Sequence, residues 1–372
     1  MIFFVNQPDL VIDHLLEYWH VVGRSGLSGR DRKEHPMDDL KFGTRSKRGD
    51  WAPNELLEPA PIWLFPPNPK KLLKWLPSYF FPYNLLFMVS ALAYWQLVVP
   101  DAAVLQNFAW GWSLKMLAVN LILAFLWYQS WELPLYVRRR QGNRFKYNHK
   151  FPADQQSNVF WFNKQTLDNM LRSLLIGVPI WTCLQVLMLW SSANGYIPWL
   201  NFAEHPVWLG VVAVVVPIIH DFHFYCIHRL IHVPVLYKYV HSVHHNSINP
   251  SPWSSLSMHP IEHLLYFGVV FWHFVIPSNP VIALYQLHFA GFGAVPGHIG
   301  FDTVETSDEQ GFDTHAYMHY LHHKYFEVNY GGEGLVPVDR MFGTYHDGSK
   351  ESDERMKARF RAKKERLKDK SA

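Results

Sequence analysis

Four apolar runs in the first two thirds of the chain constrain its fold most. They cover residues 83–99, 114–131, 174–190 and 207–219. A helix that spans a bilayer needs about 20 mostly apolar residues, with a lower limit near 17. The first three runs meet that limit, and the fourth meets it only if its helix continues through Asp221 and His223. The sequence therefore predicts an all-α, polytopic membrane helical bundle with about four spans.

The composition agrees with a membrane protein that also has a large polar part. Charged residues make up 17% of the chain, below the roughly 25% of a typical soluble domain, and apolar residues make up 49%. The mean hydropathy of −0.08 is nevertheless near zero. The formal net charge of +3 is too small to indicate nucleic-acid binding. Cys183 and Cys226 lie in apolar runs, so we expect two buried thiols and no disulfide framework.

The loops between the runs predict the orientation of the bundle. Residues 100–111 and 191–206 contain no lysine or arginine. The opposite side carries a basic set: Lys70, Lys71, Lys74, Arg138, Arg139, Arg140, Arg144, Lys146 and Lys150. Basic loops stay in the cytoplasm. We therefore expect the fourth span to return the chain to the cytoplasmic side near His228.

A last apolar block, residues 264–295, is interrupted at residues 277–280. Each half is too short for a full crossing, so the block predicts a re-entrant helical hairpin that begins and ends on one side. The chain then divides into four parts. We expect a polar, basic N-terminal extension over 1–75 whose start could form a short amphipathic helix, and three spans within 76–200. A catalytic domain over 201–348 and a charged, helical tail over 349–372 follow.

Three histidine boxes carry the functional argument. They are His228-Arg-Leu-Ile-His232, His241-Ser-Val-His244-His245 and His319-Tyr-Leu-His322-His323. Residues three or four apart lie on one face of a helix, so each box can direct its imidazoles to one point. Because an even number of membrane passes separates the second box from the third, all three boxes are expected on the same side of the bilayer.

Eight imidazoles are more than one metal ion can hold. Neutral imidazole is a ligand for Fe, Zn, Cu and Ni, and structural zinc takes only four ligands. The boxes therefore predict two metal ions in a cytoplasmic helical cap, with positions left open for oxygen. A zinc protease is disfavoured because residues 228–232 lack the glutamate of HExxH. A metal transporter would place its ligands inside the spans, near the membrane midplane.

The same residues resemble the fatty acid hydroxylase superfamily, the membrane group that includes sterol desaturases and sterol methyl oxidases. The resemblance covers about residues 220–346, a third of the chain. It rests on DFHFYCIHRLIH at 221–232, SMHPIE at 257–262, Gly297-His298, Asn329-Tyr330-Gly331 and DRMFGT at 339–344. Val338 departs from the pattern, because the family usually has tryptophan there.

The resemblance implies a set of site residues. The metal ligands would be His228, His232, His241, His244, His245, His319, His322 and His323, with His298 as a ninth. Asp221 and Glu262 would hold ligand imidazoles in the correct tautomer, as carboxylates next to metal sites often do. His259 and His263 would be further supporting residues or an extra ligand.

The activity implied is that of an integral-membrane di-iron oxidoreductase. It would use O₂ to hydroxylate or desaturate a sterol-like or long-chain acyl lipid, with electrons from a separate b-type cytochrome or from a ferredoxin with its NAD(P)H reductase. The site would face the cytoplasm, in the endoplasmic reticulum of a eukaryote or the inner or plasma membrane of a bacterium. Two alternatives stay open: aldehyde-to-alkane conversion on the same scaffold, and a non-catalytic metal-binding or metal-transport protein.

Overall fold

The structure is a computed structural model that describes residues 37–369, with gaps at 57, 153–156, 308–309 and 333. The first 36 residues, about half of the predicted extension together with its amphipathic segment, lie outside the described residues. Within the described ranges the chain is mostly helical. The fold is therefore largely the one predicted from the sequence.

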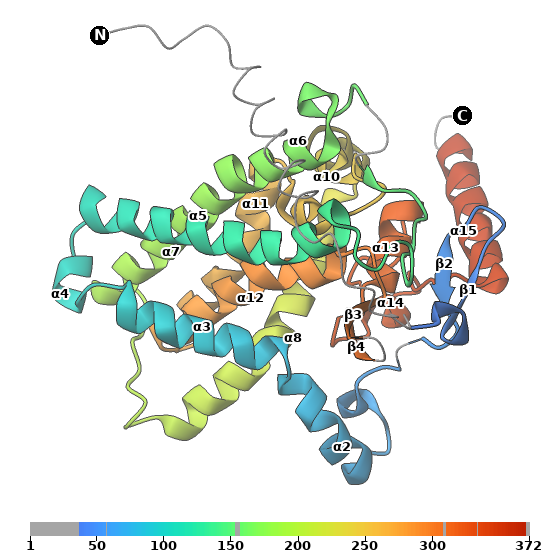
Figure 1. The fold of residues 1–372 in the computed structure, drawn as a ribbon. Coiled ribbons are helices and arrows are strands. Elements are labelled where there is room, and N and C mark those ends of the chain that lie inside the picture. Colours follow the sequence, from blue (N-terminus) through green and yellow to red (C-terminus); the bar gives the residue numbers. More distant parts are fainter. Residues whose placement is uncertain (1–36, 57, 153–156, 308–309, 333, 370–372) are drawn as a thin grey trace, which may run out of the picture.

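Long helices form a bundle around one buried helix. They are α3 (Tyr83–Leu97), α5 (Trp110–Glu132), α7 (Val178–Ala193), α8 (Pro206–Ile231) and α12 (Pro280–His298). π-helical turns extend α5 through η3 (Leu133–Val137) and join α6 (Gln165–Arg172) to α7 through η6 (Ser173–Gly177). Helix α12 packs against α3, α7 and α8, and 14 of its 19 residues are buried. It forms the centre of the core, between its neighbours in Figure 1.

Three helical segments within the described residues are long and apolar enough to span a membrane. They are Trp110–Val137, Gln165–Ala193 and Pro206–Ile231. Large apolar side chains on their outer faces, such as Leu126 and Val211, are exposed. A contiguous apolar surface of this kind needs a cover, and a bilayer provides one. The second, third and fourth predicted spans thus correspond to helices of sufficient length.

The first predicted span is shorter than the sequence indicated. Helix α3 has 15 residues, and it reaches spanning length only together with α2 (Pro69–Phe80), from which it is bent by 45°. The bend follows from Pro82, which has no N–H to donate and precedes the first residue of α3. The pair is a broken span or a re-entrant loop.

The predicted hairpin at 264–295 is also present as two helical limbs. The first consists of α11 (Pro260–Phe267) and the 3₁₀ helix η9 (Gly268–Phe274), and the second is α12. Asn279 caps the second limb by accepting a hydrogen bond from the Val281 N–H at 2.9 Å. The break therefore coincides with the predicted Pro277–Pro280 interruption.

Shorter elements complete the chain. Before the bundle lie η1 (Asp39–Lys41), β1 (Gly43–Arg45), β2 (Trp51–Pro53) and η2 (Pro61–Trp63); within it lie α4 (Ala102–Leu105) and η5 (Trp161–Asn163). The second half adds α9 (Pro234–Leu236), η7 (Tyr237–His241), α10 (Ser242–His245), η8 (Pro252–Leu256), β3 (Thr303–Ser307), β4 (Gln310–Asp313), α13 (Tyr317–Tyr325), α14 (Val338–Met341) and α15 (Lys350–Asp369). Figure 1 shows α13, α14, α15 and both strand pairs at one end of the bundle.

Two details differ from the sequence predictions. The all-α prediction missed two antiparallel hairpins, in which Thr44 pairs with Ala52 and Val304 pairs with Phe312. Both cysteines are exposed rather than buried, because they lie on the outer faces of α7 and α8, where apolar residues face out of the bundle. The charged tail forms the helix α15, as predicted.

Candidate metal centre

Helix ends bring the histidine boxes together. His228 lies in the last turn of α8, and His232 is the C-cap residue of that helix. The second box runs from the π-helical turn η7 into α10, and the third lies on α13. His298 is the last residue of α12. Four separate stretches of chain therefore end at one place.

The nine histidines form two compact groups. In each group the ligand-capable atoms all lie within 4.8 Å of one another. One group holds His228, His232, His241, His245 and His322, and the other holds His244, His298, His319 and His323. The prediction that each box converges on a single point is wrong for the two HxxHH boxes, because the fourth residue of each joins the opposite group from the first and last. Each HxxHH box thus contributes to both groups, whereas His228 and His232 of the first box both belong to the five-membered group.

The hydrogen bonds of the outer ring nitrogens fix the tautomers. The Nδ1 atoms of His228 and His322 lie 2.6 Å from the carbonyl oxygens of Tyr330 and Val328. The Nδ1 of His298 lies 2.8 Å from the carbonyl oxygen of Ala294. A carbonyl oxygen only accepts, so each Nδ1 must carry the proton and donate it. The Nε2 atoms of these rings are then left with free lone pairs.

These Nε2 atoms point at one another. The close Nε2–Nε2 pairs are His228–His241 at 3.1 Å, His232–His322 at 3.2 Å, His245–His322 at 3.0 Å, His244–His298 at 3.2 Å, His298–His319 at 2.9 Å and His319–His323 at 3.2 Å. In the pair His228–His241 both Nδ1 atoms donate to an oxygen, so two Nε2 lone pairs face each other, and this buried contact is repulsive without a cation between them. The donor set therefore fits two metal ions, one per group.

Burial keeps the imidazoles in the form that binds metal. His241, His244 and His322 are almost completely buried. Burial, followed by the neighbouring imidazoles, lowers the pKa of each of them well below its usual value. The neutral rings are therefore available as ligands at physiological pH.

Glu262 is the supporting carboxylate that the sequence analysis expected to hold a ligand ring. Its Oε1 accepts a hydrogen bond from the Nδ1 of His241 at 2.8 Å, and both side chains are buried. Helix α11 carries Glu262 in its first turn. The arrangement fixes the tautomer and orientation of His241 and raises its basicity as a ligand.

We expect Glu262→Ala to weaken metal binding by about 10- to 100-fold, the usual effect of removing a group that orients a ligand histidine. Glu262→Gln should lose less, because its amide oxygen still accepts the His241 proton. Titration of the purified, metal-free protein with Fe(II) measures both. Ile261→Ala changes an exposed residue on the same helix and serves as the control. An equal loss in that variant would mean that α11 is perturbed rather than His241.

The structure does not bring the other three supporting candidates against a ligand ring. The Asp221 carboxylate accepts hydrogen bonds from the backbone N–H groups of Leu335 and Val336 instead. His259 caps α11 through Nδ1, which accepts from the Ile261 N–H at 3.2 Å. His263 is buried beside Gly177, and neither of its ring nitrogens has a partner among the described residues. None of the three belongs to either histidine group.

Residues 329–344 pack beside the histidines, and we call this segment the roof. The Asp339 carboxylate accepts hydrogen bonds from the N–H groups of Tyr330 at 2.9 Å and Gly331 at 2.7 Å, and from the Thr344 hydroxyl at 2.5 Å. This holds the Tyr330 carbonyl against His228. Val338 is buried in the same cluster, so a smaller side chain than the family's usual tryptophan fills this roof.

Asp339→Ala should lower the free energy of unfolding by about 3 kcal/mol, because it leaves buried donors unsatisfied. The measurement is a thermal or denaturant unfolding curve in detergent. Glu351→Ala is a suitable control, since Glu351 forms an exposed pair with Arg355 at 3.7 Å and such pairs contribute little. Equal stability of the two variants would show that Asp339 does not hold the roof.

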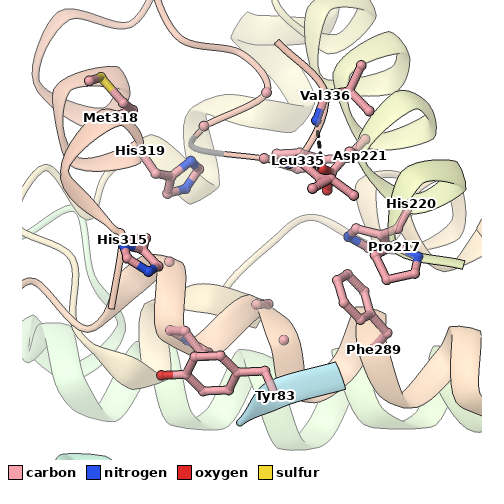
Figure 2. A pocket seen from close by; sticks show the side chains of 18 of the residues that line it. Tyr83, Pro217, His220, Asp221, Phe289, His315, Met318, His319, Leu335 and Val336 are labelled. Carbon is pink, nitrogen blue, oxygen red and sulfur yellow. Dashed lines mark hydrogen bonds between the residues drawn. The ribbon is translucent and has the colours of Figure 1, made fainter. Parts of the chain in front are cut away.

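A cavity of about 700 Å³ opens beside the histidines. Ligands from both groups line it, and it extends to Trp75 and Tyr79 on α2. In Figure 2, His319 and His315 lie on one side, and His220 and Asp221 lie on the other. Much of the remaining wall is aromatic, with Phe87, Phe224, Tyr266 and Phe289 among its residues. The size and lining suit an apolar ligand.

Several groups that position the centre could not be found from side-chain patterns. The carbonyl oxygens of Ala294, Val328 and Tyr330 carry no sequence signal, because every residue has one. Tyr136 was not predicted either. Its hydroxyl donates a hydrogen bond of 2.7 Å to the carbonyl oxygen of Ile299, the residue after His298. Its only signal was a tyrosine at the end of an apolar run.

Comparison with known proteins agrees with the geometry. Residues 213–344 match the family model described as fatty acid hydroxylase. A Delta(7)-sterol 5(6)-desaturase of Gibberella zeae is 27% identical over 197 residues, which cover 52% of this chain and 60% of the relative. A fatty acid hydroxylase of Mycosarcoma maydis is 32% identical over 129 residues, which cover 34% of this chain and 31% of the relative.

The chain spans about half the length of the curated relatives it matches first, and those relatives are Delta(7)-sterol 5(6)-desaturases of fungi. A further one, from Aspergillus fumigatus, is 31% identical over 159 residues, covering 37% of this chain and 49% of the relative. No solved structure matches the chain. The matched region contains all nine histidines and the roof segment. Residues 213–344 thus form a domain of the fatty acid hydroxylase and sterol desaturase superfamily.

Proposed function

We propose that the protein is a membrane-bound, non-haem di-iron oxygenase that hydroxylates or desaturates a lipid. The observation that carries the proposal is the pair of buried histidine groups whose Nε2 atoms face one another, at 2.9 Å for His298–His319 and 3.0 Å for His245–His322. Five and four imidazoles leave coordination positions free at each of two iron ions. The activities of the relatives, sterol desaturation and fatty acid hydroxylation, support the same function.

In this proposal the residues of the chain bind the metal ions, exclude water from the cavity and orient the substrate. The nine histidines would hold two iron ions, and when bound the iron would activate O₂ for attack on an unactivated C–H bond. The backbone carbonyls and Glu262 orient the rings. The aromatic wall of the cavity excludes water and lays an apolar substrate beside His244 and His298.

The overall reaction needs an external source of electrons. Hydroxylation puts one atom of O₂ into the C–H bond and releases the other as water, consuming two electrons and two protons. Desaturation removes two hydrogens from the substrate and releases two waters, with the same external demand. We propose that a separate protein, a b-type cytochrome or a ferredoxin with its NAD(P)H reductase, supplies the electrons.

The membrane arrangement is part of the proposal. The cavity reaches α2, which carries Lys70, Lys71 and Lys74 and has exposed apolar residues such as Leu73. A lipid could therefore enter from the bilayer side of the molecule. We propose a cytoplasmic site, in the endoplasmic reticulum of a eukaryote or the inner or plasma membrane of a bacterium. We also propose that the chain divides into an N-terminal extension, a region of three spans, a catalytic domain and a charged tail, with boundaries after residues 75, 200 and 348.

Metal transport is less well supported. The ligand His228 occupies the last turn of a candidate span, and His232 lies beyond it. A transport path would need ligands near the midplane and access from both sides. Conversion of an aldehyde to an alkane on the same scaffold stays a second enzymatic candidate, because it would use the same donor set.

The test of the proposed function is reductant-dependent O₂ uptake coupled to a change in lipid. We expect iron-loaded protein, given an electron donor and membrane lipids, to consume O₂ and yield a hydroxylated or desaturated product detectable by mass spectrometry. Metal-free protein is the control. Metal binding without reductant-dependent O₂ uptake would contradict the oxygenase and favour a metal-binding protein.

A further inference from the structure

His220 is a buried polar side chain that the proposed chemistry does not use. It lies on α8, it is 7% exposed, and it lines the cavity next to the histidine centre. Its Nδ1 has no hydrogen-bond partner among the described residues. Buried polar atoms are nearly always paired, so the unpaired Nδ1 marks a ring whose hydrogen bonding is incomplete, and a ligand would pair with the part of the ring that lines the cavity. Figure 2 shows the ring directed into the cavity.

The surroundings of His220 are aromatic. Its ring centroid lies 4.9 Å from that of Phe289, 5.6 Å from Tyr266 and 6.3 Å from Phe224. A ligand here would rest an apolar body on these rings and present a polar group to the imidazole. This combination of an apolar wall with one hydrogen-bonding group is typical of sites that fix the orientation of a lipid-like ligand.

The cavity lining of the metal-free protein offers an anion few basic partners. Among the described residues that line it, the acidic side chains are Glu58, Asp221, Glu262, Asp313 and Asp339, whereas the basic side chain is Arg340. Asp221 directly follows His220 in the chain. Arg340 is stacked on the Tyr345 ring, 3.7 Å from its centroid. In the metal-free protein, a carboxylate or phosphate head next to His220 would therefore find Arg340 as the one basic side chain among the described lining residues, apart from the imidazoles.

The position of His220 relative to the metal ligands is set by the helix. His220 precedes the ligand His228 by eight residues on α8, which corresponds to about 12 Å along the helix axis. A polar group held at His220 would fix which part of the apolar body lies against the histidine centre. His220 would then determine the position of attack without contacting the reacting atoms.

We propose that His220 is the binding residue for an uncharged hydroxyl group of the lipid substrate. A neutral imidazole has one N–H donor and one acceptor, and a hydroxyl has the same pair of functions, whereas a carboxylate only accepts. The inference rests on the proposed function only in taking a lipid as the occupant of the cavity. It adds the class of polar group that this lipid carries and the residue that recognises it.

The test is a binding measurement on the full-length, metal-free protein in detergent micelles, so it does not depend on iron or turnover. Two matched probe sets share an apolar body and differ in the head: hexadecan-1-ol, hexadecane and hexadecanoate; and cholesterol, cholest-5-ene and cholesteryl sulfate. In at least one set the alcohol should bind about tenfold more tightly than the probe without a head, the value of one buried hydrogen bond. It should also bind more tightly than the anion.

His220→Phe should remove the difference between the alcohol and the headless probe while leaving the affinity for the headless probe unchanged. His220→Asn keeps a donor and an acceptor and should retain part of the preference. His273→Phe is the matched control. His273 is also buried, its ring nitrogens have no hydrogen-bond partner among the described residues, and it lies outside the cavity lining. It should bind all probes like the wild type.

The outcomes separate cleanly. Equal binding of alcohol and headless probe by the wild type in both sets, or tightest binding of the anion, overturns the proposal even if a variant fails to fold. A preference that survives His220→Phe, or that His273→Phe abolishes as well, also overturns it. The proposed function can fail independently: a protein that binds the alcohols through His220 but takes up no iron keeps this subsite and loses the oxygenase.

Discussion

Replacing His322 or His244 by alanine should reduce lipid oxidation by more than about 100-fold, the upper end for residues that only orient a ligand. His322 belongs to the five-membered group and His244 to the four-membered group. Each variant removes one proposed ligand, so the ion in that group would be bound by one imidazole fewer. Because each HxxHH box serves both groups, we expect the loss at one ion to weaken the other. The iron content should fall from about two per chain to one or less.

His205→Ala is the control for these two variants. His205 is an exposed residue just before α8 and lies in neither histidine group. Its iron content and activity should equal those of the wild type, and all three variants should still insert in the membrane. Full turnover in His322→Ala or His244→Ala would count heavily against the centre described above.

Gly293→Phe should abolish most lipid turnover without removing iron. Gly293 lies on α12 and lines the cavity, and a Cβ there would be 3.4 Å from the Phe87 ring. The backbone therefore accepts a side chain, and the new ring must occupy the space of the substrate. Displacing a ligand from a filled cavity costs about 1–3 kcal/mol, or about 10- to 100-fold in kcat/KM.

The same change at Gly210 controls for the effect of a phenylalanine on the helix. Gly210 lies on α8, and a Cβ added there would have no described atom within 4 Å. It faces outward on a candidate span. Iron content and turnover of Gly210→Phe should match the wild type. If Gly293→Phe bound and oxidised lipid normally, the cavity would not be the substrate site.

The sequence predicted the features that depend on local spacing. Apolar runs identified α5, α7 and α8, and the spacing of the histidines predicted that each box lies on one face of a helix. The family resemblance added His298, which stands alone in the sequence and meets the other rings only because α12 ends beside α13. Glu262 was expected for the same reason, and its contact with His241 is present.

Features that depend on tertiary contacts were harder to predict. The division of each HxxHH box between two groups follows from the way η7, α10 and α13 face one another, which residue spacing does not encode. Asp221 was expected to support a ligand ring because of the resemblance of residues 221–232 to the family, but its carboxylate accepts hydrogen bonds from the N–H groups of Leu335 and Val336 instead. The cavity wall at His220 is formed by segments that are far apart in the sequence.

The stoichiometry of tightly bound iron tests the central claim most directly. Metal-free protein would be titrated anaerobically with Fe(II), and the bound metal counted per chain by elemental analysis after removal of the excess. Two interlocked histidine groups predict about two iron ions per wild-type chain, bound through imidazole nitrogen in the X-ray absorption spectrum. One ion or none per chain, or a coordination shell without imidazole nitrogen, would contradict the account.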